Sequence, residues 1–234
     1  RNHSSAASDV YKRQHKDFVN SISVSDDSKT LVSGSNDKTI KVWNLETGEH
    51  RTFTVYQDVV NSVSISSNGK TLVSGSNNGN IKVWNLETGE HHTLTGHQGM
   101  VWSVSISSNG KTLVSGSNNG NIKVWNLETG EHRTFTGHQG GVNSVTLSKD
   151  DKTLFSCGFD LNIKMWNLET GEHHTLTGHN SWVRSLSVSD DGKTLVSSDH
   201  AGNIKVWNLE TGGHRTPISY THLRAHETSE NRVC

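Results

Sequence analysis

The chain has 234 residues, of which 30% are hydrophobic and 19% are charged, and its formal net charge is -1. A near-neutral chain lacks the basic excess that drives sequence-independent binding to nucleic-acid phosphates. No stretch approaches the roughly 18 apolar residues of a membrane-spanning helix, and the first ten residues lack the apolar centre of a signal peptide. Cys157 and Cys234 provide neither a disulfide framework nor zinc-ligand spacing. We therefore expect a folded protein without nucleic-acid or membrane partners, and the scarcity of cysteine favours a cytoplasmic location.

An internal repeat organises most of the chain. Five tryptophans stand 41 residues apart, each followed by Asn-Leu-Glu-Thr-Gly: Trp43, Trp84, Trp125, Trp166 and Trp207. The repeats span 14–54, 55–95, 96–136, 137–177 and 178–218, without insertion or deletion. Ser62–His91 and Ser103–His132 are identical in sequence, which indicates a recent internal duplication. A fixed period of this length is typical of solenoids and propellers.

Within each repeat, short apolar runs alternate with turn signals, as the third repeat shows. VWSVSIS (101–107) alternates apolar and small polar residues, SSNGKT supplies a turn, and TLVSGS (112–117) follows as a second strand. NNGN is a tight turn before a third strand, IKVWNL (122–127), and ETGE is the turn before a fourth, HRTFT (132–136). No window has helical periodicity. The pattern predicts an all-β chain whose repeats are four-stranded antiparallel blades of a β-propeller.

These residues resemble the WD-repeat β-propeller family. The third repeat, GHQGMVWSVSISSNGKTLVSGSNNGNIKVWNLETGEH, has the opening Gly-His, the second-strand Ser and the third-strand Trp at the family's spacing, although each blade ends Trp-Asn rather than Trp-Asp. Near-identical repeats are typical of the bacterial members. Because rings of this family usually have seven blades, the resemblance implies a partial propeller, open or truncated, with a compact five-blade ring as the alternative. Uncovered faces on the first and last blades would favour self-association.

The two flanks, residues 1–13 and 219–234, depart from the repeat. SSAASDVYKRQ and PISYTHLRAHET resemble translated sequencing-adapter read-through. We expect both flanks to be artefactual and assign them no function.

The resemblance implies a hydrogen-bonded group of four in each blade, made of the opening His, the second-strand Ser, a turn Asp and the Trp indole. Repeats one and four have complete sets, which are His15, Ser33, Asp37 and Trp43, and His138, Ser156, Asp160 and Trp166. Repeat three has His97, Ser115 and Trp125, with Asn119 as an uncharged acceptor for the His.

Repeats two and five depart further from this pattern. Repeat two has Ser74 and Trp84, but Tyr56 replaces the His and Asn78 replaces the Asp. Repeat five has His179, Ser197 and Trp207, but Ala201 cannot accept a hydrogen bond. A group that lacks a partner leaves buried donors unpaired, so we predict blades two and five to be the least stable.

His, Ser and Asp are also the residues of a hydrolytic triad. Because the set recurs in every blade with Trp as its fourth member, we interpret it as structural and predict no catalytic activity. The histidines seven residues after each framework Trp lie on different blades, too far apart to share a metal ion: His50, His91, His132, His173 and His214. We predict no metal and no cofactor. The once-per-blade lysines, such as Lys41, and glutamates, such as Glu46, indicate a solvated surface.

The repeats differ most in the residues that open each blade. In WD-repeat propellers these residues lie on the narrow top face, where the third and fifth positions after the opening His and the residue before the turn Asp commonly contact partners. The large or charged residues there are Phe18, Met100, Trp102, Phe159, Trp182, Arg184 and His200. All but Phe18 should cluster on blades three to five, with Gly141 leaving a depression between Met100 and Trp182.

Residues of these types are enriched in binding surfaces, so we predict a scaffold that presents its top face to a peptide or protein partner. Three alternatives stay open. The same residues could pack on loops or on further blades, the protein could be an enzyme with its active site in the central channel, or it could be a purely structural spacer.

Overall fold

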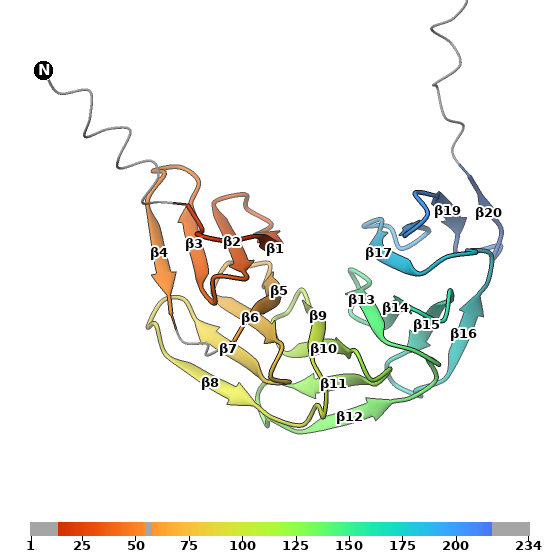
Figure 1. Cartoon of the computed structure of the whole chain (residues 1–234), viewed down its shortest axis with the longest axis horizontal. Helices are drawn as coiled ribbons and strands as arrows, with labels where there is room; N and C mark the ends of the chain where they lie inside the picture. The colour runs from red at the N-terminus through yellow and green to blue at the C-terminus, as the bar shows by residue number, and fades with distance from the viewer. Residues whose placement is uncertain (1–13, 55–57, 217–234) are drawn as a thin grey trace, which may run out of the picture.

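The computed structural model of the chain describes residues 14–54 and 58–216. Across these residues it consists of strands and turns without a helix, arranged in five antiparallel four-stranded sheets. Each sheet contains four consecutive strands in chain order. Figure 1 shows the sheets following one another around an open arc, with the first strand of each on the inner side and the fourth on the outer side. The prediction of an all-β, partial propeller is confirmed, and both flanks that we interpret as artefactual lie outside the described residues.

The five blades have nearly the same strand boundaries. Blade one contains β1 (Val19–Val24), β2 (Thr30–Ser35), β3 (Ile40–Asn44) and β4 (His50–Phe53). Blade two contains β5 (Val60–Ile65), β6 (Thr71–Ser76), β7 (Ile81–Asn85) and β8 (His91–Leu94). Blade three contains β9 (Val101–Ile106), β10 (Thr112–Ser117), β11 (Ile122–Asn126) and β12 (His132–Phe135). Blade four contains β13 (Val142–Leu147), β14 (Thr153–Gly158), β15 (Ile163–Asn167) and β16 (His173–Leu176). Blade five contains β17 (Val183–Val188), β18 (Thr194–Asp199), β19 (Ile204–Asn208) and β20 (His214–Arg215).

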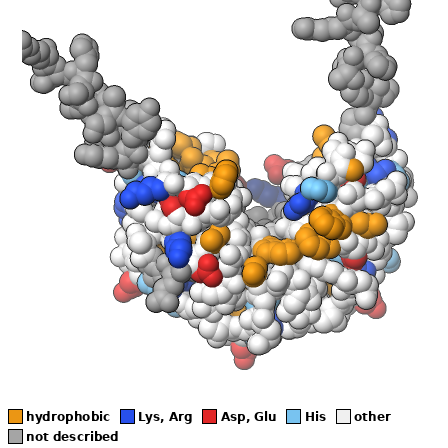
Figure 2. Space-filling view, in the orientation of Figure 1, with side chains coloured by type: hydrophobic (Ala, Val, Ile, Leu, Met, Phe, Trp, Pro, Cys, Tyr) orange, Lys and Arg blue, Asp and Glu red, His pale blue; other side chains and the backbone are white. Residues whose placement is uncertain are grey.

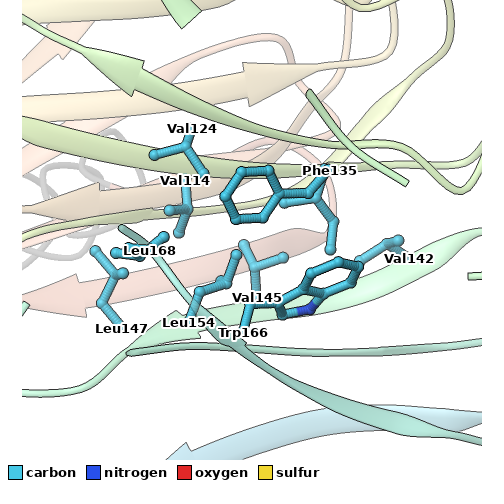
Figure 3. Close-up of a cluster of buried hydrophobic side chains, with 10 residues drawn as sticks. Val114, Val124, Phe135, Val142, Val145, Leu147, Leu154, Trp166 and Leu168 are labelled. Atoms are coloured by element: carbon cyan, nitrogen blue, oxygen red, sulfur yellow. The ribbon is translucent and has the colours of Figure 1, made fainter. Parts of the chain in front are cut away.

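Adjacent blades pack face to face through apolar side chains. Between blades three and four, Val114, Val124 and Phe135 meet Val145 and Trp166 in a buried cluster (Figure 3). Equivalent clusters join the other three pairs of neighbouring blades. Full burial of one such side chain stabilises by roughly 1.5–3 kcal/mol. The fold is therefore stabilised mainly where neighbouring sheets pack together. A blade at the end of the arc has one sheet face without a neighbour and loses the contribution of that face.

Because apolar and small polar residues alternate in each first strand, the strand contacts both the preceding and the following blade. Val145 of β13 lies in the cluster with the preceding blade. The serines of the same strands point to the following blade, where Ser62 Oγ accepts the Val104 N–H at 3.1 Å and Ser103 Oγ accepts the Val145 N–H at 3.0 Å. These bonds pair buried polar groups that would otherwise be costly to bury. The inner strands are thus joined by apolar contact and by hydrogen bonds at once.

The once-per-blade histidines pack against the framework tryptophans. Ring centroids lie 4.7 Å apart for Trp43 and His50 and 4.4 Å apart for Trp84 and His91. The other three blades repeat the contact at 4.3 to 4.5 Å. Within the described part of the chain, no group of three or more His, Cys, Asp or Glu side chains is placed to hold a metal ion. These histidines therefore contribute aromatic packing at the outer strands.

The expectation that the repeated lysines and glutamates form one solvated surface is wrong for three of the five lysines. Lys41, Lys123 and Lys164 are buried, and the ammonium groups of all three contact threonine hydroxyls on the neighbouring outer strand. Burial lowers the pKa of Lys41 and Lys123. The glutamates pair with a different set of lysines in the turns, as Glu87 does with Lys70 at 2.8 Å. Sequence spacing could not show this because strand pairing decides which lysine each glutamate meets.

The two ends of the arc expose apolar side chains that the inner blades bury. Ile22 on blade one is 66% exposed, whereas the equivalent Val63 and Val104 are buried. Ile204 on blade five is likewise exposed, whereas Ile163 is buried. In the turns that follow the first strands, Lys149 of blade four pairs with Asp26 of blade one at 2.7 Å, but both side chains are about half exposed, so this bond stabilises little.

Among the described residues, no helix is long and apolar enough to cross a membrane.

Candidate functional site

Blades one and four contain the complete hydrogen-bonded group. In blade four, His138 Nδ1 lies 2.9 Å from Asp160 Oδ2, His138 Nε2 lies 2.7 Å from Ser156 Oγ, and the Trp166 indole N–H donates to the same Ser156 Oγ at 2.7 Å. Blade one repeats this arrangement with His15, Asp37, Ser33 and Trp43. Burial would raise the pKa of the Asp160 carboxyl, but the hydrogen bond and charge of His138 hold it below its usual range. The group ties the blade opening to the second and third strands.

Blade five departs from the prediction, because its His has a carboxylate partner after all. His179 Nδ1 lies 2.8 Å from Asp199 Oδ2, and His179 Nε2 lies 2.7 Å from Ser197 Oγ. Asp199 ends β18 and lies two positions before Ala201. Blades one to three carry serine at the position of Asp199. Burial opposes ionisation, yet the bonds from Asn203 and His179 lower the pKa of Asp199 to about 2. The expectation that Ala201 leaves this blade incomplete was wrong, because a carboxylate two residues earlier reaches the same nitrogen.

Blade three is the incomplete one. His97 Nε2 pairs with Ser115 Oγ at 2.7 Å, but His97 Nδ1 is buried and has no hydrogen-bond partner among the described residues. The side-chain Oδ1 of Asn119 instead accepts the Asn121 backbone N–H at 3.1 Å. The expectation that Asn119 would serve as the acceptor was therefore wrong. Burial, with the nearby charges of Lys123 and His132, lowers the pKa of His97 to about 4.

Blade two retains the Trp–Ser part of the group. The Trp84 indole N–H donates to Ser74 Oγ at 3.2 Å, as in the other blades. Asn78 accepts from Ser76 Oγ at 2.6 Å within the turn. Tyr56, which replaces the His, lies outside the described residues. The low stability expected of blade two stays a prediction.

The unpaired His97 gives a testable pH dependence. Its pKa is about 4 in the folded chain and 6.5 ordinarily, so between these values the unfolded chain binds a proton that the folded chain does not. The free energy of unfolding should therefore be highest, as far as His97 determines it, above about pH 6.5, and it should fall as the pH decreases towards 4. Urea denaturation at several pH values should show a steeper loss for the native sequence than for His97→Gln. Equal losses would contradict the assignment.

A β-bulge in every first strand sets the direction of one side chain at the blade opening. The pairing register shifts around the bulged residue in all five blades, at Asn20, Asn61, Trp102, Asn143 and Arg184. In blades one, two and four this residue is an Asn whose amide donates to a backbone carbonyl of the next blade, at 2.8 to 3.0 Å. Bulges commonly re-aim a side chain beside a functional site. In blades three and five the same position presents an indole and a guanidinium.

Four rings from blades three to five form one continuous row, which we call the aromatic row: Trp102, Phe159, Trp182 and His200. Centroid separations are 5.3 Å for Trp102 and Phe159, 4.6 Å for Phe159 and Trp182, and 5.5 Å for Trp182 and His200. The Arg184 guanidinium carbon lies 6.0 Å from the Trp182 ring centroid, and Arg184 Nη2 donates to His200 Nδ1 at 3.2 Å. Figure 2 shows a band of hydrophobic side chains over this arm of the arc, whereas on the other arm acidic and basic side chains lie among separate hydrophobic patches.

The expected depression at Gly141 is filled by the Trp102 ring. Gly141 is buried, and a Cβ atom there would lie 2.6 Å from Trp102 Cζ3. Any larger residue would displace the indole towards its neighbours. Gly141 therefore allows the row to cross from blade three to blade four, and the site is a ridge of rings rather than a hollow.

The two remaining candidates lie at the margin of this arrangement. Met100 is 40% exposed and precedes the bulged strand of blade three. Phe18 is highly exposed on blade one, at the opposite end of the arc, and no ring contact joins it to the row in the described structure. Six of the seven candidates are thus on blades three to five, and Phe18 is separate from them.

A family model for the IFT122 first β-propeller matches residues 9–222. The chain belongs to this β-propeller family. None of the curated proteins matches the chain. The match agrees with the four-stranded antiparallel blades of the structure. It says nothing about the aromatic row, which depends on residues that differ between the blades of this one chain.

Proposed function

We propose that this propeller is a non-catalytic scaffold that holds a peptide or protein partner on the aromatic row. The observation that carries the proposal is a continuous set of ring contacts that stays accessible, with the Trp182 side chain 42% exposed. Large exposed apolar clusters on soluble proteins are usually interaction sites, and Trp and Arg are enriched among the residues that dominate binding. Membership of a β-propeller family of the IFT122 type supports a role in protein interaction.

Two observations weigh against the catalytic alternatives. Ser115, Ser156 and Ser197 are buried, and each Oγ atom accepts an indole N–H, so none is placed as an exposed nucleophile. The serines of the inner strands bond to neighbouring blades instead of lining a reactive channel. The non-identical openings of blades three to five argue against a purely structural spacer. The absence of nucleic-acid partners, the cytoplasmic location and the bacterial type are further proposals that rest on composition and repeat similarity.

A peptide-display selection tests the proposed site. Peptides enriched on the full chain should bind Trp102→Ala/Trp182→Ala at least about tenfold more weakly, because two ring anchors are removed. Binding to Leu45→Ala, which truncates a similarly exposed apolar residue on blade one, should be unchanged. Circular dichroism should show that all three proteins are folded. Enriched peptides that bind the double variant as well as they bind the native chain would overturn the proposal.

The uncovered faces of blades one and five support a second partner, another copy of the chain. Ile22 and Ile204 are exposed at the two ends of the arc. In the blades between the ends, the equivalent residues are buried, and each of those blades packs against neighbours of closely similar sequence. Sedimentation velocity should show concentration-dependent association of the native chain, reduced in Ile22→Ser/Ile204→Ser because the apolar area is smaller. A native chain that stays monomeric across the concentration range would contradict self-association without affecting the proposed peptide site.

A further inference from the structure

The aromatic row offers ring edges rather than open ring faces. Phe159 and Trp182 stack at an interplanar angle of 21°, and Trp182 and His200 stack at 27°. The facing sides of these three rings are occupied by one another, so a planar ligand such as a nucleobase could insert between them only by separating them. A flexible chain lying across the edges needs no such opening. The geometry favours a peptide over a stacked ligand.

The length of the row limits how much peptide it holds. Its three centroid separations are 5.3, 4.6 and 5.5 Å. An extended chain advances about 3.3 Å per residue, so the row spans at most about four or five residues. Side chains two residues apart in such a chain point to the same side. Two large apolar side chains of the partner can therefore contact the row together.

The blade-five end of the row carries a positive charge that lacks a carboxylate. Arg184 is exposed, and no ion pair is formed by its guanidinium within the described residues. The two carboxylates nearest to the row in sequence, Asp160 and Asp199, both pair with histidines inside their blades. By contrast, the turn lysine Lys193 of the same blade is matched by Glu210 at 2.8 Å.

Hydrogen-bond donors predominate along the row. Arg184 supplies its fork of N–H groups beside Trp182 and His200. Arginine binds carboxylates through paired hydrogen bonds that are stronger than those between neutral groups. A row of apolar ring edges with a guanidinium at one end is complementary to an apolar segment that ends in a negatively charged acceptor.

Resting on the proposed function, we propose that the partner segment is an extended acidic peptide. Two large apolar side chains, two residues apart, lie on the edges of Phe159 and Trp182. A carboxylate beyond them binds Arg184 beside His200 at the blade-five end. The carboxylate sets the direction in which the peptide lies along the row and makes the site selective for acidic peptides. The rings contribute most of the affinity.

Fluorescence anisotropy with the full chain and synthetic probes tests this pairing. Each fluorescein-labelled probe has nine residues, with leucine and phenylalanine two positions apart and two glutamates after them or, in a second set, before them. Matched probes carry two glutamines or two lysines in place of the glutamates. In one of the two orders, the glutamate probe should bind about tenfold more tightly than the glutamine probe and still more tightly than the lysine probe, because a charged hydrogen bond is gained.

Two variants identify the residue responsible. Arg184→Gln should abolish the preference, so that the glutamate and glutamine probes bind with about the same affinity. The affinity for the glutamine probe should stay nearly unchanged. Lys193→Gln, which removes the same charge elsewhere on blade five, should keep the preference. Trp182→Ala should weaken binding of the glutamate and glutamine probes alike.

The outcomes separate this inference from the proposed function. Equal binding of glutamate and glutamine probes, lost in Trp182→Ala, would overturn the acidic partner while leaving the peptide site in place. A preference for the lysine probe, or a glutamate preference that survives Arg184→Gln, would also overturn it. Failure of every probe to bind would overturn the inference, and the display selection would then decide separately whether the row binds any peptide.

Discussion

Replacing Asp199 with serine, the residue that blades one to three carry at this position, should lower the free energy of unfolding by about 2–4 kcal/mol. The substitution removes the acceptor of His179 Nδ1 and leaves a buried donor unpaired. It also removes the acceptor of the backbone N–H groups of Ala201 and Asn203. Urea denaturation followed by tryptophan fluorescence measures the change.

A positional exchange provides the control. In Asp199→Ser/Ala201→Asp the carboxylate returns to the turn position that Asp37 and Asp160 occupy in blades one and four. Because those carboxylates reach the His of their own blades from that position, the double variant should recover most of the lost stability. If Asp199→Ser alone is as stable as the native chain, the carboxylate of β18 does not complete the group in blade five.

Replacing Asn119 with aspartate should raise the free energy of unfolding by about 1–2 kcal/mol at neutral pH. The new carboxylate would accept the hydrogen bond of His97 Nδ1, which has no partner among the described residues. A negative charge beside the ring also favours its protonated form, so the pKa of His97 should rise from about 4. Denaturation and NMR titration of the His97 ring measure the two effects.

The same substitution in blade two is the matched control. Asn78 occupies the equivalent turn position, but residue 56 of that blade is tyrosine rather than histidine. Asn78→Asp should therefore give no comparable gain. A gain of equal size in both variants would mean that the turn itself prefers aspartate, and the unpaired nitrogen of His97 would not be the cause.

The fold was predictable because its information is local and repeated five times. Asn-Gly and Asp-Gly turns between short alternating runs specify antiparallel strands without reference to distant residues, and the structure places the strands of blade three within one or two residues of the expected ranges. The framework tryptophans and the second-strand serines follow from the same repetition.

The hydrogen-bonded groups were less predictable where one repeat differs from the others. The predictions for blades three and five rest only on Asn119 and Ala201, the residues at the expected turn position. Asp199 reaches His179 from the end of β18, and Asn119 turns its oxygen to Asn121. The sequence contains a signal for the Asp199–His179 contact, since Asp199 is acidic where blades one to three have serine. Whether the Asp199 carboxylate reaches the ring of His179 depends on backbone geometry.

By itself, the sequence determined an all-β propeller of five blades, and it indicated that blades three to five carry the unusual side chains of the openings. Only the tertiary structure decided how those side chains meet. The bulges aim Trp102 and Arg184, and the lack of a side chain at Gly141 lets the Trp102 ring lie over the start of the next blade. Phe159 of blade four then joins the rings on either side. The ring contacts between blades join residues as far apart as Trp102 and Phe159, so strand register and sheet packing set them, and no local pattern encodes either.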